Sequence, residues 1–519
     1  MKGRRPGLVY GFASVMLSFL VLCSTLWYGF GGDQAWFSYC AWVWRKFGQV
    51  PYVDVFEQNF PGIFIIHYFV QAVLGEGVSA FRFFDLAWQT ATAFLLYLAA
   101  GRIFANRLSG LLAAVLYSLY YVNLGLWHTG ERDGFLLLLY VSSFLLLFRR
   151  EPAEAGIFDV VPSGLLLGVG FIIKPIAVFE WLVLAALIWK SSQAKFSSLL
   201  GYGFGLVLPF AACILYYWHL GGLDEFFTCL FSFNFKVYLD YGLSGFRGLL
   251  KGMLMIDYLR ANLLLWLGGV LVVPFLSKLS AAGRKLGFWG LLLLAGAYSG
   301  YLFQGKYGYH FYYHEAPVWG MLCIFAGGGW SLAIRFLAAR WDSRRIIPST
   351  LFSLALMICG LLLFRPEVKD YFSRALRSSP NTGRHQSPYY HNIWEIAGYV
   401  RSRTRPKDGV QVWGGETGIN YFSRRRAHSR FPNTLHLVPF RPGQELLSPL
   451  QRRLGEEFLA DLKKNPPVYF IISTLPYFNQ SSCKNALVQD YAEVWDFVRS
   501  RYFLEKDWAG SVEIWRLRD

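Results

Sequence analysis

The sequence predicts an α-helical integral membrane bundle that carries juxtamembrane helices and a C-terminal soluble α/β domain on its outer face. The chain is 55% hydrophobic and only 16% charged, with a mean hydropathy of +0.34, whereas soluble domains contain about 25% charged residues. Apolar runs of membrane-crossing length recur through residues 1–364. After about residue 365 these runs end, and helix patterns alternate with short strand patterns, as in an α/β domain.

The formal net charge is +17, and many Lys and Arg residues lie in short connectors between apolar runs. Positive charge in short loops marks the cytoplasmic side of a membrane protein, so the basic balance indicates topology rather than nucleic-acid binding. The seven cysteines are scattered, without the spacing of a metal site or of a disulfide framework. One bridge among Cys40, Cys229 and Cys483 stays open, because all three would face the exterior.

Residues 1–30 combine a basic head with an apolar run. The run is too long for the apolar core of a typical signal peptide, and no A-x-A-like cleavage site precedes Gly31. We therefore expect an uncleaved first span whose N-terminus lies in the cytoplasm.

Eleven segments are predicted to cross the membrane, since about 20 apolar residues span a bilayer as a helix. One further segment, 61–75, is apolar but shorter, and it contains His67 and Gln71. The predicted spans are 8–30, 82–101, 108–126, 134–148, 161–174, 176–190, 197–218, 260–277, 286–303, 317–334 and 346–364.

The charges of the connectors decide whether 61–75 crosses the membrane. If it does not, the later connectors rich in Lys and Arg all fall on the side of the basic N-terminus. If it does, the connector that holds Arg102 and Arg107 faces outward, against the positive-inside tendency. We therefore expect 61–75 to lie on the outer surface as an interfacial helix, which places the C-terminus outside as well.

These assignments give two predicted domains: a membrane domain at 1–364, which includes the long outer loop 31–81, and an extracytoplasmic α/β domain at 365–519. The inner loops are short and basic, whereas the outer ones are long and aromatic, so function is expected on the outer face. The α/β domain is expected to contain helices at 392–404, 450–464 and 486–501 and strands at 409–413, 468–473 and 512–517.

Asp33 follows Gly31 and Gly32 at the start of the first outer loop. A carboxylate at the outer membrane boundary could take a proton from an acceptor hydroxyl. Asp33 also precedes an amphipathic pattern at 34–47 and could be its N-cap, and the two roles are compatible. Farther along this loop, Tyr52, Asp54 and Glu57 are expected to shape the site or to bind substrate.

The second outer loop packs Glu131, Arg132 and Asp133 between two very apolar spans. Charges at membrane depth indicate function by default, although a solvated turn explains them equally well. Lipid-linked phosphate needs positive charge near the interface, which Arg132, Lys174, Lys306 or His310 could supply. The alternatives are that Lys174 snorkels to the membrane surface and that the aromatic turn 304–316, which holds Tyr312 and His314 as candidate substrate contacts, is an aromatic belt.

No cofactor is certain from the sequence. His310 and His314 are spaced i, i+4 and could hold a divalent metal with Glu57 or Glu315, but two histidines without further ligand spacing usually form hydrogen bonds. The chain lacks a Walker-type loop and an HExxH helix. The glycines at 201–205 lie in an apolar span, where small residues allow close helix packing. Because the sequence shows no soluble nucleotide-sugar module, we expect the sugar donor to be delivered in the membrane.

Several short motifs together resemble those of the GT-C glycosyltransferase superfamily, specifically the bacterial relatives of protein mannosyltransferases and of lipid A aminoarabinose transferase. The resemblance covers roughly residues 1–190, and the later spans match in layout more than in motif. It is carried by Gly32-Asp33-Gln34, Tyr52-Val53-Asp54, Glu57-Gln58-Asn59-Phe60-Pro61-Gly62, Arg82 and Glu131-Arg132-Asp133.

The resemblance implies a sugar donor linked through phosphate to a polyprenol such as undecaprenol, and an inverting single displacement that modifies lipopolysaccharide or another cell-envelope glycan. It implies that Asp33 is the base toward the acceptor and that Asp133 assists, with Glu131 as the alternative second-loop acid. Two departures stand out: Gln34 follows Asp33 where many relatives have a second acid, and Phe60 precedes Pro61 where many have a lysine.

We therefore expect an inverting glycosyltransferase of the bacterial cytoplasmic membrane that moves one sugar to a hydroxyl of a lipid, glycan or protein. The alternatives are a transporter or flippase of lipid-linked sugars, which would need polar residues near the midplane of several spans, and a ligase of whole glycan chains resembling O-antigen ligases. Arg247 and Lys251 in the loop 219–259 keep the ligase open. Arg424-Arg425-Arg426 and Arg430 could contact an anionic acceptor or form a solvated basic loop.

Overall fold

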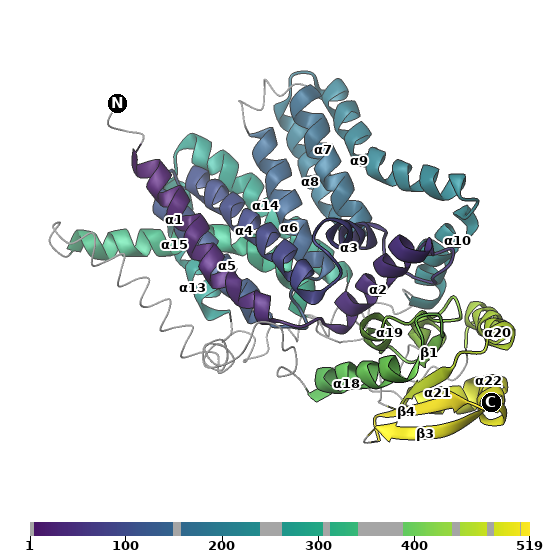
Figure 1. The fold of residues 1–519 in the computed structure, drawn as a ribbon. Helices are drawn as coiled ribbons and strands as arrows, with labels where there is room; N and C mark the ends of the chain where they lie inside the picture. The colour runs from purple at the N-terminus through teal and green to yellow at the C-terminus, as the bar shows by residue number, and fades with distance from the viewer. Residues whose placement is uncertain are drawn as a thin grey trace. The chain divides into compact units, whose positions relative to one another are not determined.

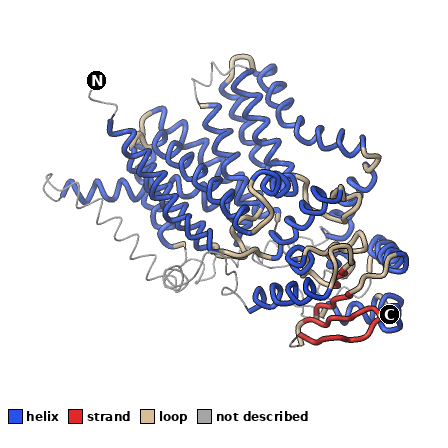
Figure 2. Tube along the Cα trace, in the orientation of Figure 1, coloured by secondary structure: helices blue, strands red, loops and turns tan. Residues whose placement is uncertain are grey.

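The computed structural model is mostly helical, with one four-stranded sheet (Figures 1 and 2). It describes residues 5–148, 157–238, 262–304, 312–340, 388–438, 447–474, 482–508 and 510–518. The chain forms two compact units, each described below by itself. The first contains Met1–Tyr28, Phe81–Cys213 and Ser244–Thr382, and the second contains Gly29–Ala80, Ile214–Leu243 and Gly383–Asp519.

The first unit is a bundle of helices, and each predicted span that falls within the described residues coincides with a helix or with two consecutive helices. Five of the described helices are long and apolar enough to cross a membrane. The predicted span 346–364 lies outside the described residues, so the total of eleven stays a prediction. The helices are α1 (Arg5–Leu22), η1 (Cys23–Trp27), α4 (Val78–Ile103), α5 (Arg107–Asn123), α6 (Arg132–Leu147), α7 (Ile157–Ile173), η3 (Pro175–Ala177), α8 (Val178–Ser191), α9 (Lys195–His219), α13 (Leu263–Val272), η5 (Val273–Lys278), α14 (Ala281–Phe303), η6 (Tyr312–Glu315) and α15 (Ala316–Arg340).

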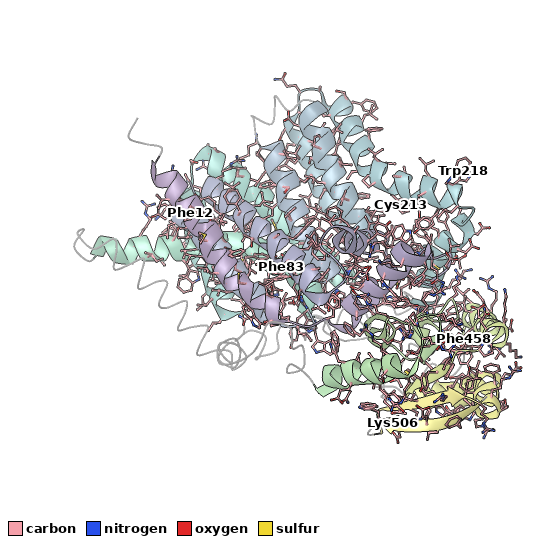
Figure 3. All side chains as sticks on the ribbon, in the orientation of Figure 1. Phe12, Phe83, Cys213, Trp218, Phe458 and Lys506 are labelled. Carbon is pink, nitrogen blue, oxygen red and sulfur yellow. The ribbon has the colours of Figure 1, made fainter. Side chains whose placement is uncertain are left out.

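Large apolar side chains are exposed on the outside of these helices. Phe12 on α1 is 69% exposed and Phe83 on α4 is 57% exposed, and both are labelled in Figure 3. Other large apolar side chains on the same helices are also exposed, among them Phe19 and Leu20 on α1. These faces suit contact with lipid, in agreement with the composition of the chain.

Glycines allow α7 and α9 to approach closely. A Cβ atom at Gly164 would lie 2.2 Å from the Tyr202 carbonyl oxygen, and one at Gly205 would lie 2.3 Å from the Val161 carbonyl oxygen. Small residues permit such backbone contact between membrane helices. The interpretation of the glycines at 201–205 as packing residues therefore holds for Gly205, whereas a Cβ at Gly203 would meet nothing within 4 Å.

The second unit combines the first outer loop with the sheet and its helices. In the sheet order β1-β2-β4-β3, β1 and β2 are parallel, and β4 is antiparallel to both of its neighbours. The elements are α2 (Gly32–Phe47), α3 (Gly62–Val73), α10 (Leu223–Phe227), η4 (Thr228–Tyr238), α18 (Pro388–Arg403), β1 (Val410–Trp413), α19 (Gly418–Ser423), η8 (Thr434–His436), α20 (Pro449–Lys464), β2 (Tyr469–Ser473), α21 (Cys483–Asp490), α22 (Ala492–Arg501), β3 (Tyr502–Trp508) and β4 (Val512–Leu517).

The core of the sheet region is aliphatic and forms where the strands pack on α18 and α19. Its fully buried members include Val410, Ile471 and Ile514 from three strands and Ile396 from α18. The sequence analysis identified β1, β2 and β4 but missed the edge strand β3. The predicted domain boundary at 364/365 falls outside the described residues and stays a prediction, as does the extracytoplasmic position of this region.

The segment predicted to lie on the membrane surface forms the short helix α3. Its 12 residues rise by about 18 Å at 1.5 Å per residue, less than the roughly 30 Å of a hydrocarbon core. Its polar residues His67 and Gln71 are buried, whereas Ile65, Phe69 and Val73 are exposed. A helix of this length does not cross a bilayer, and its exposed face is the apolar one.

The cysteines form no bridge among the described residues. Cys40, Cys229 and Cys483 are each buried and free, so the bridge that the sequence left open among them is not present.

Gly205→Ala is expected to destabilise the bundle, because the new methyl group would overlap a backbone atom of α7 that cannot move aside. Overpacking of this kind costs about 1–3 kcal/mol. Gly203→Ala is the matched control in the same helix, where the substitution adds a helix-favouring residue in open space. Thermal unfolding in detergent should show a lower midpoint for Gly205→Ala alone, and equal midpoints for the two variants would contradict this packing.

Candidate active site

A buried charged cluster lies in the first unit, where four segments meet. The Lys174 Nζ atom lies 2.5 Å from Asp133 Oδ2 and 3.0 Å from His314 Nδ1. The Asp133 carboxylate also accepts a hydrogen bond from Gln304 Nε2 at 3.2 Å. Asp133 is fully buried and Lys174 is 7% exposed. A lysine and an aspartate 41 residues apart in the chain thus form an ion pair inside the bundle.

The local sequence explains why Lys174 and Asp133 lie at the ends of helices. Lys174 ends α7 in an extended conformation, because the following Pro175 disfavours helical geometry at the residue before it. Asp133 lies in the first turn of α6, where the helix dipole favours a negative charge. Both side chains therefore project from helix ends.

An aromatic ring lies beside the ammonium group and contacts further rings. Lys174 Nζ lies 5.6 Å from the centroid of the Tyr313 ring, within the range of a cation–π interaction. The His128 ring stacks on Tyr313 at a centroid distance of 5.7 Å and lies 5.4 Å from Tyr312. Tyr313 and His314, which belong to the segment interpreted as a possible aromatic belt, therefore lie beside Lys174.

The burial of this ion pair needs an explanation other than stability. Burying two charges together often gains no stability, because desolvation offsets their attraction. A buried pair in a membrane bundle is by default a functional hypothesis. Lys174 carries a positive charge held by Asp133 and His314, which is the chemistry that recognises a phosphate group.

In the second unit, Glu57 organises the first outer loop. Its fully buried carboxylate accepts hydrogen bonds from Trp36 Nε1, from the backbone N–H groups of Gln58 and Asn59 at 2.8 Å each, and from Asn59 Nδ2 at 2.7 Å. These bonds close the loop on itself. Glu57 is therefore a structural residue of the loop, and a contact with substrate stays a prediction.

Tyr52 and Asp54 are held in the same loop. Tyr52 is fully buried and has a φ of 71°, which is an uncommon and strained conformation for a residue with a side chain. Its hydroxyl donates to the Asn59 carbonyl oxygen at 2.5 Å, and Asp54 Oδ2 accepts from the Val50 N–H at 2.8 Å. The side chains of the loop therefore form hydrogen bonds with its own backbone.

Arginines of the 424–430 segment anchor this loop to the sheet region within the second unit. Arg430 Nη2 donates to the Tyr52 carbonyl oxygen at 2.5 Å, and the Arg430 carbonyl oxygen accepts from the Phe56 N–H at 2.8 Å. Arg430 also pairs with Glu457 at 3.0 Å, and Arg424 pairs with Glu76 at 3.4 Å. These arginines have partners within the protein, which makes the solvated-loop interpretation wrong for them.

His436 packs on the loop from the same side. Its ring lies 5.1 Å from Phe56 and 6.4 Å from Trp36, measured between centroids. Burial lowers the pKa of His436 to about 4. The ring is therefore neutral near pH 7 and acts as part of the aromatic packing.

Asp33 is exposed in the first turn of α2. The N-cap of this helix is Gly31, and the Gln34 side chain closes the capping box, so Asp33 is not the cap that the sequence allowed. The Asp33 carboxylate therefore lies at the N-terminal end of α2 but does not cap the helix.

The other predicted site residues divide into two groups. Lys306 and His310 lie outside the described residues, whereas Tyr312, Glu131 and Arg132 lie in the first unit with Lys174. No group of three or more His, Cys, Asp or Glu side chains that could hold a metal occurs in the described parts of the chain. A divalent metal held by Glu57, His310 and His314 stays a prediction, because His310 lies outside the described residues.

Sequence reasoning missed three buried polar residues of the first unit. Gln304 reaches Asp133, and Asp85 and Gln89 lie one turn apart on α4, both fully buried. The available signal was an Asp and a Gln spaced i, i+4 within an apolar span that begins with Arg82.

Comparison with known proteins matches part of the chain to a family and nearly all of it to a fold. Residues 59–218 match the family of dolichyl-phosphate-mannose-protein mannosyltransferases. The structure of ArnT from Cupriavidus metallidurans bound to undecaprenyl phosphate matches with a TM-score of 0.57 and 13% identity, over 98% of this chain and 97% of that one. At this identity the match shows the fold.

A second solved structure, the archaeal oligosaccharyltransferase AglB from Archaeoglobus fulgidus in complex with an inhibitory peptide and a dolichol-phosphate, matches with a TM-score of 0.47 and 12% identity, over 89% of this chain and 69% of that one. A comparison with curated protein sequences finds no match.

Arg430→Ala is expected to loosen residues 50–60, because it removes the guanidinium group from the Tyr52 carbonyl and from Glu457. A charged hydrogen bond contributes about 1.5–3 kcal/mol, so amide hydrogen exchange in this loop should accelerate by roughly tenfold or more. The control is Arg426→Ala, which removes a guanidinium group that stacks on Phe47 at 4.4 Å. Equal exchange in the two variants would show that Arg430 does not hold the loop.

Proposed function

We propose that this chain, a relative of the GT-C glycosyltransferases by family match and fold, moves a single sugar from a polyprenyl phosphate to a hydroxyl acceptor. The observation that carries the proposal is the buried Lys174–Asp133–His314 cluster in the helical unit. ArnT, which has the same fold, binds undecaprenyl phosphate, and a buried ammonium group in a membrane bundle is suited to that ligand.

The donor set of Lys174 leaves room for a phosphate oxygen. An ammonium group has three N–H donors, and the contacts to Asp133 and His314 account for two of them. Asp133 keeps the lysine charged and oriented in a buried site. The polyprenyl chain of the donor would lie along the apolar helix surfaces, and no soluble nucleotide-binding module is needed.

The reaction that these groups support is a single displacement. The acceptor oxygen attacks the anomeric carbon and forms the new glycosidic bond, while the bond from that carbon to the phosphate oxygen breaks. The phosphate leaves with the electron pair, and the Lys174 charge stabilises it. One displacement inverts the configuration at the anomeric carbon.

Asp33 is proposed as the base that takes the proton of the acceptor hydroxyl, an assignment that rests on the family resemblance. Its exposed carboxylate in the first turn of α2 is accessible to an acceptor. General-base catalysis of this kind contributes about 10²–10⁴-fold. Glu131 remains the alternative to Asp133 as the second-loop acid.

The cytoplasmic membrane of a bacterium is the proposed location, with the N-terminus inside and the sheet region outside. Two features support it: the basic connectors fall on one side of the predicted spans, and α3 exposes an apolar face suited to a membrane surface. The acceptor is a lipid, glycan or protein of the cell envelope.

Lys174→Met is expected to weaken binding of undecaprenyl phosphate by roughly 10-fold to 100-fold, the loss that corresponds to one charged hydrogen bond. The control is Lys190→Met, which removes an exposed lysine of the same unit that lies over Phe288. Affinity should be measured on the full chain in lipid nanodiscs, with the thermal midpoint recorded for each variant. Unchanged affinity in a folded Lys174→Met protein would exclude Lys174 as the phosphate ligand.

Asp33→Asn is expected to reduce transfer by about 10²-fold or more, while binding of undecaprenyl phosphate and the thermal midpoint stay near the wild-type values. The readout is mass analysis of cell-surface glycans in a deletion strain complemented with each variant. Asp496→Asn, at an exposed position on α22, serves as the matched control. A normal glycan profile with Asp33→Asn would refute the base assignment.

A further inference from the structure

A buried phenol links the second outer loop to the helices behind it. The Tyr121 hydroxyl accepts a hydrogen bond from the Gly130 N–H at 2.7 Å and donates one to Asp85 Oδ1 at 2.7 Å. Tyr121 and Asp85 are both fully buried. The backbone of the loop is thus connected through one hydroxyl of α5 to a carboxylate of α4.

Arg82 holds the same loop from α4. Its Nη1 atom donates to the Thr129 carbonyl oxygen at 3.2 Å and to Thr129 Oγ1 at 3.0 Å, and it lies 3.7 Å from Asp85 Oδ2. Gly130 presses against α4, where a Cβ atom would lie 2.7 Å from the Phe81 ring, and its φ is +74°. Only glycine fits this approach without strain.

Gln89 extends the network to the first turn of α6. Its Nε2 atom lies 3.0 Å from Asp85 Oδ1 and 3.4 Å from the Gly134 carbonyl oxygen, and its Oε1 atom accepts from the Tyr117 hydroxyl at 2.5 Å. The anchored backbone positions are therefore 129, 130 and 134. They bracket Glu131, Arg132 and Asp133 on both sides.

A turn between two apolar helices can form without a buried network of charged and polar side chains. A carboxylate and a guanidinium group buried inside a membrane bundle lose several kcal/mol of hydration, whereas a few turn residues would connect α5 to α6. The network instead binds the backbone at 129, 130 and 134, on both sides of Asp133. Asp133 in turn holds the Lys174 ammonium group at 2.5 Å, so a small shift of the loop would move the charge on which phosphate binding depends.

We propose that Arg82, Asp85 and Tyr121 are positioning residues, which hold Asp133 and through it Lys174 in the geometry that binds the donor phosphate. This inference rests on the proposed function of the Lys174 cluster. The network acts through Asp133 and does not itself touch the phosphate.

The test is a double-mutant cycle on the full chain in nanodiscs, with undecaprenyl phosphate as the ligand. Tyr121→Phe should weaken binding by about threefold to tenfold, because it removes the hydrogen bonds of the hydroxyl to the Gly130 N–H and to Asp85 and affects the phosphate only through Asp133. In the Asp133→Asn background, the same substitution should change the affinity by less than twofold, because the residue through which Tyr121 acts is already altered. A purely structural role would instead give independent, additive effects.

Tyr120→Phe is the matched control on the same helix. The Tyr120 hydroxyl is buried and has no hydrogen-bond partner among the described residues, so its loss should leave the affinity unchanged. Thr129→Val is the second variant: it removes the contacts of the Thr129 hydroxyl with Arg82 Nη1 and with the Gly125 carbonyl oxygen, and it changes no residue of α4 or α5. It enters the same cycle if Tyr121→Phe does not fold.

The outcomes separate this inference from the proposed function. Normal affinity in Tyr121→Phe, together with weak binding in Lys174→Met, overturns the positioning role and leaves the phosphate site standing. Additive effects of Tyr121→Phe and Asp133→Asn also overturn the positioning role. Normal affinity in Lys174→Met overturns the phosphate site itself.

Discussion

The ion pair between Lys174 and Asp133 is the interaction on which the helical unit is organised. Two opposite charges that are 2.5 Å apart and buried must each keep a partner, because an unpaired charge in this setting would be strongly destabilising. Gln304 also donates a hydrogen bond to the carboxylate, and His314 Nδ1 lies 3.0 Å from the ammonium group. The end of α7, the start of α6 and the aromatic turn before α15 are thereby drawn to one point.

The second unit depends on a different constraint, namely a strained and closed loop. Tyr52 keeps a left-handed conformation because its carbonyl is bound by Arg430 and its hydroxyl by Asn59. Glu57 satisfies the donors of the turn that follows. The segment 424–436, which belongs to the sheet region, supplies much of this support. The sheet region is therefore part of the same compact unit as the first outer loop and helps to shape it.

Hydropathy was sufficient to locate the helices, because burial in lipid requires continuous apolar surface and leaves a clear signal in the sequence. Asp133 and Lys174 were found for a related reason: a charge beside an apolar run is conspicuous. Their pairing could not be predicted, because Asp133 and Lys174 are 41 positions apart and Lys174 and His314 are 140 positions apart, and local geometry does not bring such distant residues together. β3 was missed because an edge strand containing Glu505, Lys506 and Asp507 lacks the alternation of a half-buried strand.

The sequence left two interpretations open for Arg424 and Arg430, contact with an anionic acceptor or a solvated loop. It could not show that they pair with Glu76 and Glu457, because these partners come from distant segments. Phe60 bears on where a phosphate-binding cation could come from. At the position before the proline, where the motif that this chain resembles often has a lysine, Phe60 is buried and packs near Phe231. If the proposed function is right, the cation for the donor phosphate comes from another element. Among the described residues of the helical unit, Lys174 is the lysine that is buried, and it is paired with Asp133.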